Sequence, residues 1–173
     1  MPTDLVHHIA LTMVPHIGDI HARELIGYFG NAENIFKARK SDLDKLPGIG
    51  EVRARSIKEF KDFKRAEEEM RFIEKFKIEV LVLGAPGYPK RLLNCYDAPL
   101  LLYFRGKADL NAEKIVSIIG TRNNTDYGKE SAREIIEDLA PYKVLIVSGL
   151  AYGVDSIAHK LALKQDLPTV GIL

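Results

Sequence analysis

The chain has 173 residues, 46% of them hydrophobic and 28% charged, and a formal net charge of +1 at pH 7. This length allows one large domain or two small ones, and the balanced charge means that any phosphate-binding surface must come from local placement of cations. The only cysteine, Cys95, excludes an internal disulfide framework. The sequence shows neither a signal-peptide pattern nor an apolar run long enough to span a membrane, which predicts a cytoplasmic protein.

The N-terminal third has a helical periodicity, and its clearest element is LDKLPGIGEVRARSI, which starts at Leu43. This stretch predicts a helix, a tight glycine hairpin and a second helix, and it resembles a helix-hairpin-helix motif. In such a motif the glycines, here Gly48 and Gly50, let the backbone approach a phosphate, which the N–H groups of the following helix bind. Arg53 and Arg55 would lie close to that phosphate.

A weaker copy of the pattern, VPHIGDIHAREL, starts at Val14 and departs from the double-glycine form at Ile17-Gly18. The two copies predict a degenerate pair of helix-hairpin-helix units in a small all-α domain of residues 1–66. Counting charges over that range gives 11 Lys/Arg against 9 Asp/Glu, a net of +2. Two interpretations stay open, because such a pair either contacts DNA or serves as a packing module.

Residues 64–77 predict a charged amphipathic helix whose apolar side carries Met70, Ile73 and Phe76. We interpret it as a solvated helix that connects the first domain to a second one, residues 67–173. The second domain is predicted to be α/β and Rossmann-like.

The sheet of this second domain is predicted to be mostly parallel, with helices on both faces. Its strands are near-continuous apolar runs, expected at 79–83, 101–104, 115–119, 144–147 and 169–173. Such sheets bind ligands at the carboxyl ends of their strands. Two loops leave strands at that edge and lead into predicted helices, whose unpaired N–H groups favour an anion such as a phosphate.

The first of these loops, GTRNNT from Gly120, carries Arg122, whose guanidinium can hold a phosphate bidentately or form a structural ion pair with Asp126 or Asp155. Neither loop has the glycine spacing of a dinucleotide-binding fold or of a P-loop, so we expect no nucleotide cofactor. Asp155 and His159 share a helix face, but two side chains do not complete a metal site. We expect neither a metal nor a catalytic role, and interpret Asp155 as a helix cap or as the group that orients His159.

Two blocks of this region carry a resemblance to a known family. IGTR from Ile119, followed by Tyr127-Gly128, and SGLAYGVDSIAHKLAL from Ser148 resemble the signature blocks of the DNA-processing protein A (DprA/Smf) family. The resemblance implies a non-enzymatic protein that binds single-stranded DNA, acts in natural transformation and DNA recombination, and loads the recombinase RecA. It also implies a DNA site within these blocks, formed by Gly120, Thr121, Arg122, Ser148, Gly149, Leu150, Ala151, Gly153 and Lys160.

Four side chains near this expected site have two interpretations each. Tyr127 and Tyr152 lie beside the loops and would either stack on bases or pack against the protein. Lys90 and Arg91 either flank the DNA groove or are simply solvated.

A domain rarely stops inside a core strand such as 169–173, so we expect the sheet to be incomplete at its C-terminal part. A homodimer is implied for the full-length protein, and the oligomeric state of this chain stays open. An alternative function of another class is an enzyme or sensor that binds a nucleotide derivative in a related Rossmann-like fold, with Asp155 as the available carboxylate. A third is an interaction domain whose loops bind nothing.

Overall fold

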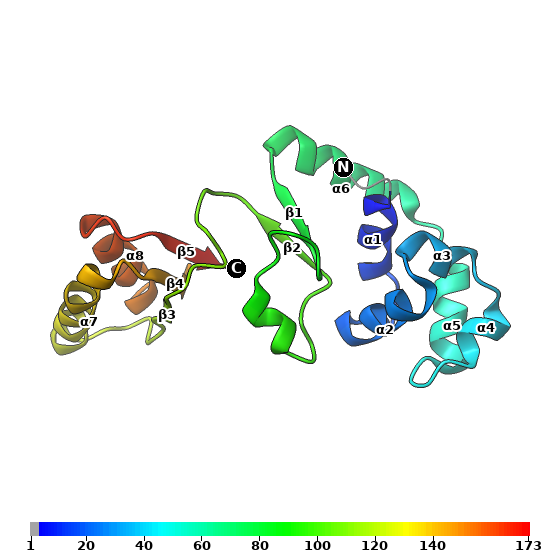
Figure 1. Ribbon diagram of the computed structural model, residues 1–173, viewed down its shortest axis with the longest axis horizontal. Coiled ribbons are helices and arrows are strands. Elements are labelled where there is room, and N and C mark those ends of the chain that lie inside the picture. The colour runs from blue at the N-terminus through cyan, green and yellow to red at the C-terminus, as the bar shows by residue number, and fades with distance from the viewer. Residues whose placement is uncertain (1–3) are drawn as a thin grey trace. The chain divides into compact units, whose positions relative to one another are not determined.

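The computed structural model describes residues 4–173, and the chain divides into two compact units after Arg105. The first unit is mainly helical and the second is α/β (Figure 1). The first contains α1 (Leu5–Thr12), α2 (Asp19–Phe29), α3 (Ala32–Lys37), α4 (Lys40–Asp44), α5 (Gly50–Glu59), α6 (Phe63–Phe76), β1 (Glu79–Val82), η1 (Lys90–Asn94) and β2 (Leu101–Phe104). The second contains β3 (Ile115–Ser117), α7 (Asp126–Leu139), η2 (Ala140–Tyr142), β4 (Leu145–Gly149), α8 (Val154–Lys164) and β5 (Thr169–Ile172).

The two predicted hairpins, between α1 and α2 and between α4 and α5, have matching backbones. Gly48 has a φ of +79°, and His16 adopts +66° in the corresponding place of the first hairpin. The next residue is a buried isoleucine in both cases, Ile17 with 7% and Ile49 with 1% exposure. Each isoleucine N–H donates to the carbonyl three residues earlier, at 3.2 and 3.1 Å. The first hairpin therefore keeps the left-handed turn although glycine, which favours it, is absent.

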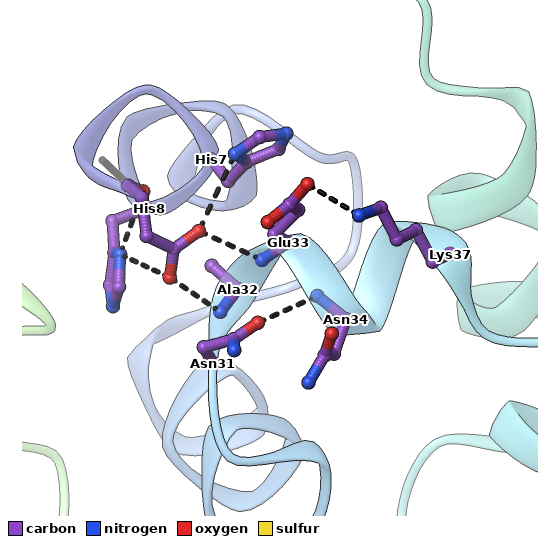
Figure 2. Close-up of polar contacts among 8 residues, drawn as sticks. His7, His8, Asn31, Ala32, Glu33, Asn34 and Lys37 are labelled. Atoms are coloured by element: carbon purple, nitrogen blue, oxygen red, sulfur yellow. Dashed lines mark hydrogen bonds and ion pairs between the residues drawn. The ribbon is translucent and has the colours of Figure 1, made fainter. Parts of the chain in front are cut away.

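The N-terminus of α3 shows how side chains complete the helical unit. The Asp4 carboxylate accepts hydrogen bonds from the N–H groups of Ala32 at 3.0 Å and Glu33 at 2.9 Å, and Asn31 accepts one from the N–H of Asn34 at 2.8 Å (Figure 2). These N–H groups have no partner inside the helix, so the two side chains satisfy the first turn of α3.

Helix α6 is part of the core rather than a solvated connector. It packs on α1 and buries Ala66 and Ile73, which are 0% and 1% exposed. Met70 also packs against this core. The solvated-connector interpretation is therefore wrong for Met70 and Ile73, whereas Phe76 at the end of the helix is 39% exposed.

Strands β1 and β2 form a separate two-stranded sheet. They pair antiparallel, with Val82 opposite Leu101. The prediction that both belong to the parallel sheet is therefore wrong. Because Leu101 is buried in the same core as the helices, packing joins these strands to the first unit. The contacts of β1 and β2 with the helices show how the chain packs and do not test where the sequence domains meet. The domain boundary at residue 66 therefore stays a prediction.

The second unit holds the predicted parallel sheet, in the order β3-β4-β5. Helices α7 and α8 pack against each other, and right-handed crossovers in this strand order place both on one face of the sheet. Their apolar sides bury a core of Ile136, Val144, Ile146, Ala158, Ala162 and Leu167. The fold class is thus confirmed, with one difference: the expected crossover helices on both faces lie on a single face.

Strand β5 lies at the edge of this sheet, and its Ile172 is 61% exposed. The expectation of a core strand is therefore wrong for its last residues. No helix within residues 4–173 is long and apolar enough to cross a bilayer.

Candidate functional site

The two loops at the carboxyl edge of the parallel sheet are bonded to each other. Ser148 is 2% exposed, and its hydroxyl donates to the Ile118 carbonyl at 2.6 Å. The N–H of Val154, which begins α8, donates to the Thr121 carbonyl at 3.1 Å. These bonds hold the two loops together at the predicted edge. The hydroxyl proton of Ser148 is engaged inside the protein, so this residue positions the strand ends.

The glycines of the loops allow this close packing. A Cβ atom at Gly120 would lie 2.7 Å from Cγ2 of Val154, and one at Gly149 would lie 2.5 Å from Oδ2 of Asp155. Gly153 has a φ of +87°, and a Cβ there would overlap a backbone carbonyl oxygen of the other loop. Gly120 and Gly153 therefore leave no room for a side chain, whereas a Cβ at Gly149 would displace the end of the Asp155 side chain. Contact of their backbone with a phosphate stays a prediction.

Arg122 lies exposed on the first loop. Within residues 4–173 its guanidinium makes no hydrogen bond and no ion pair, so a structural pair with Asp126 or Asp155 is not formed. Asp126 instead contacts Lys129 Nζ at 2.8 Å, and this hydrogen bond lowers the pKa of the Asp126 carboxyl. The donors of Arg122 are thus available to an anion.

The two helix N-termini at this edge differ. In α7 the hydroxyl of Thr125 accepts from the N–H three residues on, at 3.1 Å, and the adjacent Asp126 side chain is 98% exposed. In α8 the capping residue is Gly153, which has no side chain to accept a bond. The N–H groups of Asp155 and Ser156 have no acceptor in the described part of the chain. Each helix therefore leaves two N–H groups of its first turn without an acceptor among the described residues, those of Asp126 and Tyr127 in α7 and those of Asp155 and Ser156 in α8.

Asp155 does not orient His159, and it does not cap α8, whose N-cap is Gly153 without a side-chain hydrogen bond. His159 Nε2 lies 2.7 Å from the Gly149 carbonyl and so carries the proton it donates, while Nδ1 lies 2.7 Å from Oγ1 of Thr169. His159 is thus oriented by β4 and β5. Asp155 is only 8% exposed. No group of three potential metal-ligating side chains occurs between residues 4 and 173.

The remaining predicted residues are more exposed. Leu150 is 60% exposed and Ala151 is half-buried. Tyr127 and Tyr152 are 83% and 87% exposed, so they do not pack into the protein. Lys160 lines an open groove of about 460 Å³ between α7 and α8.

In the helical unit, Arg53 is engaged by the protein itself. Its Nε donates to the His16 carbonyl and its Nη1 to the Gly48 carbonyl, both at 3.1 Å. It thus ties the left-handed positions of the two hairpins together. Gly50 opens α5 with a φ of +60°, and Arg55 is exposed without a hydrogen bond or ion pair among the described residues.

Two residues of the first loop were not predicted. Thr125 is the N-cap of α7, and a threonine just before an amphipathic run is a recognisable signal for that role. Asn124 has a buried Nδ2 without an acceptor in the described residues. No sequence signal marks an unsatisfied amide of this kind, because it depends on how the loop folds.

Comparisons with known proteins match both the helical and the α/β part of the chain. A family model described as DNA recombination-mediator protein A matches residues 79–173, and one described as helix-hairpin-helix motif matches residues 9–69. Protein Smf of Synechocystis sp. is 29% identical over 179 residues, covering 99% of this chain and 44% of that protein. DNA processing protein DprA of Streptococcus pneumoniae is 37% identical over 86 residues, covering 50% of this chain and 30% of that protein.

The X-ray structure of DprA from Streptococcus pneumoniae matches with a TM-score of 0.73 and 23% identity, over 96% of this chain and 56% of that one, which shows a shared fold. The chain thus spans about half the length of this structure, and 44% of the Synechocystis protein. Since the recombination-mediator model covers more than half of the sequence, the chain belongs to the DNA recombination-mediator protein A (DprA/Smf) family.

Proposed function

We propose that this chain binds single-stranded DNA at the loops on the carboxyl edge of its parallel sheet. The observation that carries the proposal is Arg122, an exposed guanidinium with no partner among residues 4–173, on a loop that Gly153 and Val154 hold in place. A guanidinium with free donors is suited to a phosphate.

Nearby groups supply the other interactions that a single strand needs. Tyr127 and Tyr152 expose aromatic rings, and stacking of one base on such a ring contributes about 1–3 kcal/mol without regard to sequence. The free N–H groups in the first turn of α8 add donors at the same edge. Binding of a single strand through its phosphates should weaken as the salt concentration rises, because each phosphate contact releases counterions.

We extend the proposal to a role in natural transformation and recombination, in the cytoplasm, in which the full-length homodimer loads RecA on incoming DNA. The family description, recombination mediator, and the name of the Streptococcus pneumoniae relative, DNA processing protein, support this role. The rate of RecA filament assembly on single-stranded DNA, with and without the protein, tests it. An unchanged rate would contradict the RecA part alone.

The DNA-binding proposal is tested by fluorescence anisotropy with a labelled oligonucleotide at two salt concentrations. Arg122→Ala is expected to weaken binding about tenfold and to reduce the salt slope by about one contact. Arg71→Ala is the matched control, because Arg71 is 69% exposed on α6 in the other unit. Unchanged affinity in folded Arg122→Ala protein would remove this residue from the site.

A further inference from the structure

The outer surfaces of α7 and α8 carry two pairs of unpartnered charges of opposite sign. Glu134 and Asp138 lie one turn apart on α7, and Lys160 and Lys164 lie one turn apart on α8. All four residues are exposed, and within residues 4–173 none of their side chains joins an ion pair or a hydrogen bond. An acidic row on one helix therefore lies beside a basic row on the next.

The helical period places both rows on the side away from the core. Glu134 follows the buried Ala132 by two positions, which turns it by about 200° around the helix axis, and Lys160 follows the buried Ala158 in the same way. The second member of each row repeats this offset one turn later. Because α7 and α8 pack against each other, both rows face solvent on the same side of the unit.

The groove of about 460 Å³ between the two helices has an apolar part and a basic rim. Ile157 and Leu161 line it and are half-buried, and the two lysines of α8 stand beside them. The carboxylates of α7 that line the groove are paired with Lys129 and Arg133 of the same helix, so they do not serve the lysines of α8. An occupant with apolar side chains and carboxylates would cover the apolar part and pair with these lysines.

We propose that the occupant is a second copy of this chain, related by a two-fold axis, whose α7 lies on the groove. A two-fold contact is isologous, so the acidic row of each copy meets the basic row of the other. Both rows span one helical turn, about 6 Å, so their charges are spaced alike. A DNA strand fits this surface less well, because its phosphates would meet the carboxylates of Glu134 and Asp138. The inference is independent of the proposed DNA binding.

The test reverses the charges of one row at a time. Sedimentation equilibrium at low salt, with up to about 1 mM protein, measures self-association of the wild-type chain and of two double variants. One variant is Lys160→Glu/Lys164→Glu, in which both rows are acidic. The other is Glu134→Lys/Asp138→Lys, in which both rows are basic.

We expect the wild type to dimerise and each double variant to associate at least about tenfold more weakly, because like charges then meet across the two-fold axis. An equimolar mixture of the two variants should associate again. In that mixture the acidic α7 of one variant meets the basic α8 of the other, and the basic α7 meets the acidic α8. Only a contact between α7 of one copy and α8 of the other gives this recovery.

The matched control is Arg71→Glu/Lys75→Glu, which reverses two cations one turn apart on α6 and should associate like the wild type. Circular dichroism checks that each variant folds, and the single reversals Lys160→Glu and Glu134→Lys replace a double variant that does not. A wild-type chain that stays monomeric would overturn the inference. Dimers that both variants retain, or a mixture that does not recover association, would overturn it as well.

Discussion

Arg53 and Arg122 occupy similar positions in the two units, yet the structure uses them differently. Each lies near a glycine with positive φ and a helix N-terminus, which is the pattern expected of a phosphate site. Arg53 donates to the carbonyls of His16 and Gly48, whereas Arg122 has no partner in residues 4–173. An arginine beside a glycine turn therefore indicates an anion site only where its donors are free.

The two units thus differ in whether an arginine beside a glycine turn serves packing or is free for binding. In the helical unit, the arginine that a helix-hairpin-helix pattern assigns to DNA holds its two hairpins together, which favours the packing interpretation of that pair. In the α/β unit, glycines allow the two loops to pack closely, and Arg122 stays exposed.

Gly153→Ala should have the largest effect on stability. The residue has a φ of +87°, and the added Cβ would overlap a carbonyl oxygen of the Arg122 loop. We expect a loss of about 3 kcal/mol or more in the free energy of unfolding, measured by urea denaturation. Gly27→Ala is the control, because this glycine lies within α2 with open space around it and should stabilise the chain by up to about 1 kcal/mol. Equal changes in the free energy of unfolding for the two variants would mean that the Arg122 loop moves to accommodate the added Cβ without cost.

Arg53→Ala should destabilise the helical unit by about 1–3 kcal/mol, because two carbonyls lose a charged donor. Thermal unfolding followed by circular dichroism measures the change. Arg55→Ala is the control, because Arg55 lies two positions further along α5 and so on another face of the helix, and it should leave Tm unchanged. A drop in Tm for Arg55→Ala and none for Arg53→Ala would contradict the assignment.

Ser148→Ala should cost about 1–2 kcal/mol, since the Ile118 carbonyl loses its buried partner. DNA affinity should fall slightly, because this bond holds the strand end that carries the Arg122 loop. Ser56→Ala is the control: its hydroxyl bonds to the Val52 carbonyl within α5, where alanine is a better helix former. Both variants are compared by urea denaturation, and similar losses would show that the Ser148 bond has no special role.

Lys160→Ala should change DNA affinity by no more than about twofold, because exposed lysines at the edge of a site contribute little individually. Lys160 lines the groove between α7 and α8 rather than the loops. Anisotropy titration measures the effect, and a tenfold loss would extend the DNA site into that groove.

The sequence predicts those parts of the fold that depend on the order of neighbouring residues. Continuous apolar runs such as 115–119 and 144–147 indicate parallel strands, and the glycine hairpin at Gly48 indicates two helices. The direction of β1 was not predictable, because a four-residue strand carries no information about its partner. The loops of the site and Arg122 followed from strand ends, whereas the partners of His159 in the site and of Arg53 in the helical unit depend on packing between distant residues.

The most direct test of the account measures Tm and single-strand affinity for Arg53→Ala and Arg122→Ala in the same buffer. The account predicts opposite results: Arg53→Ala lowers Tm and keeps its affinity once folded, while Arg122→Ala keeps its Tm and loses about tenfold in affinity. Weakened binding by a folded Arg53→Ala protein, together with unchanged binding by Arg122→Ala, would contradict it and place the DNA site on the hairpins.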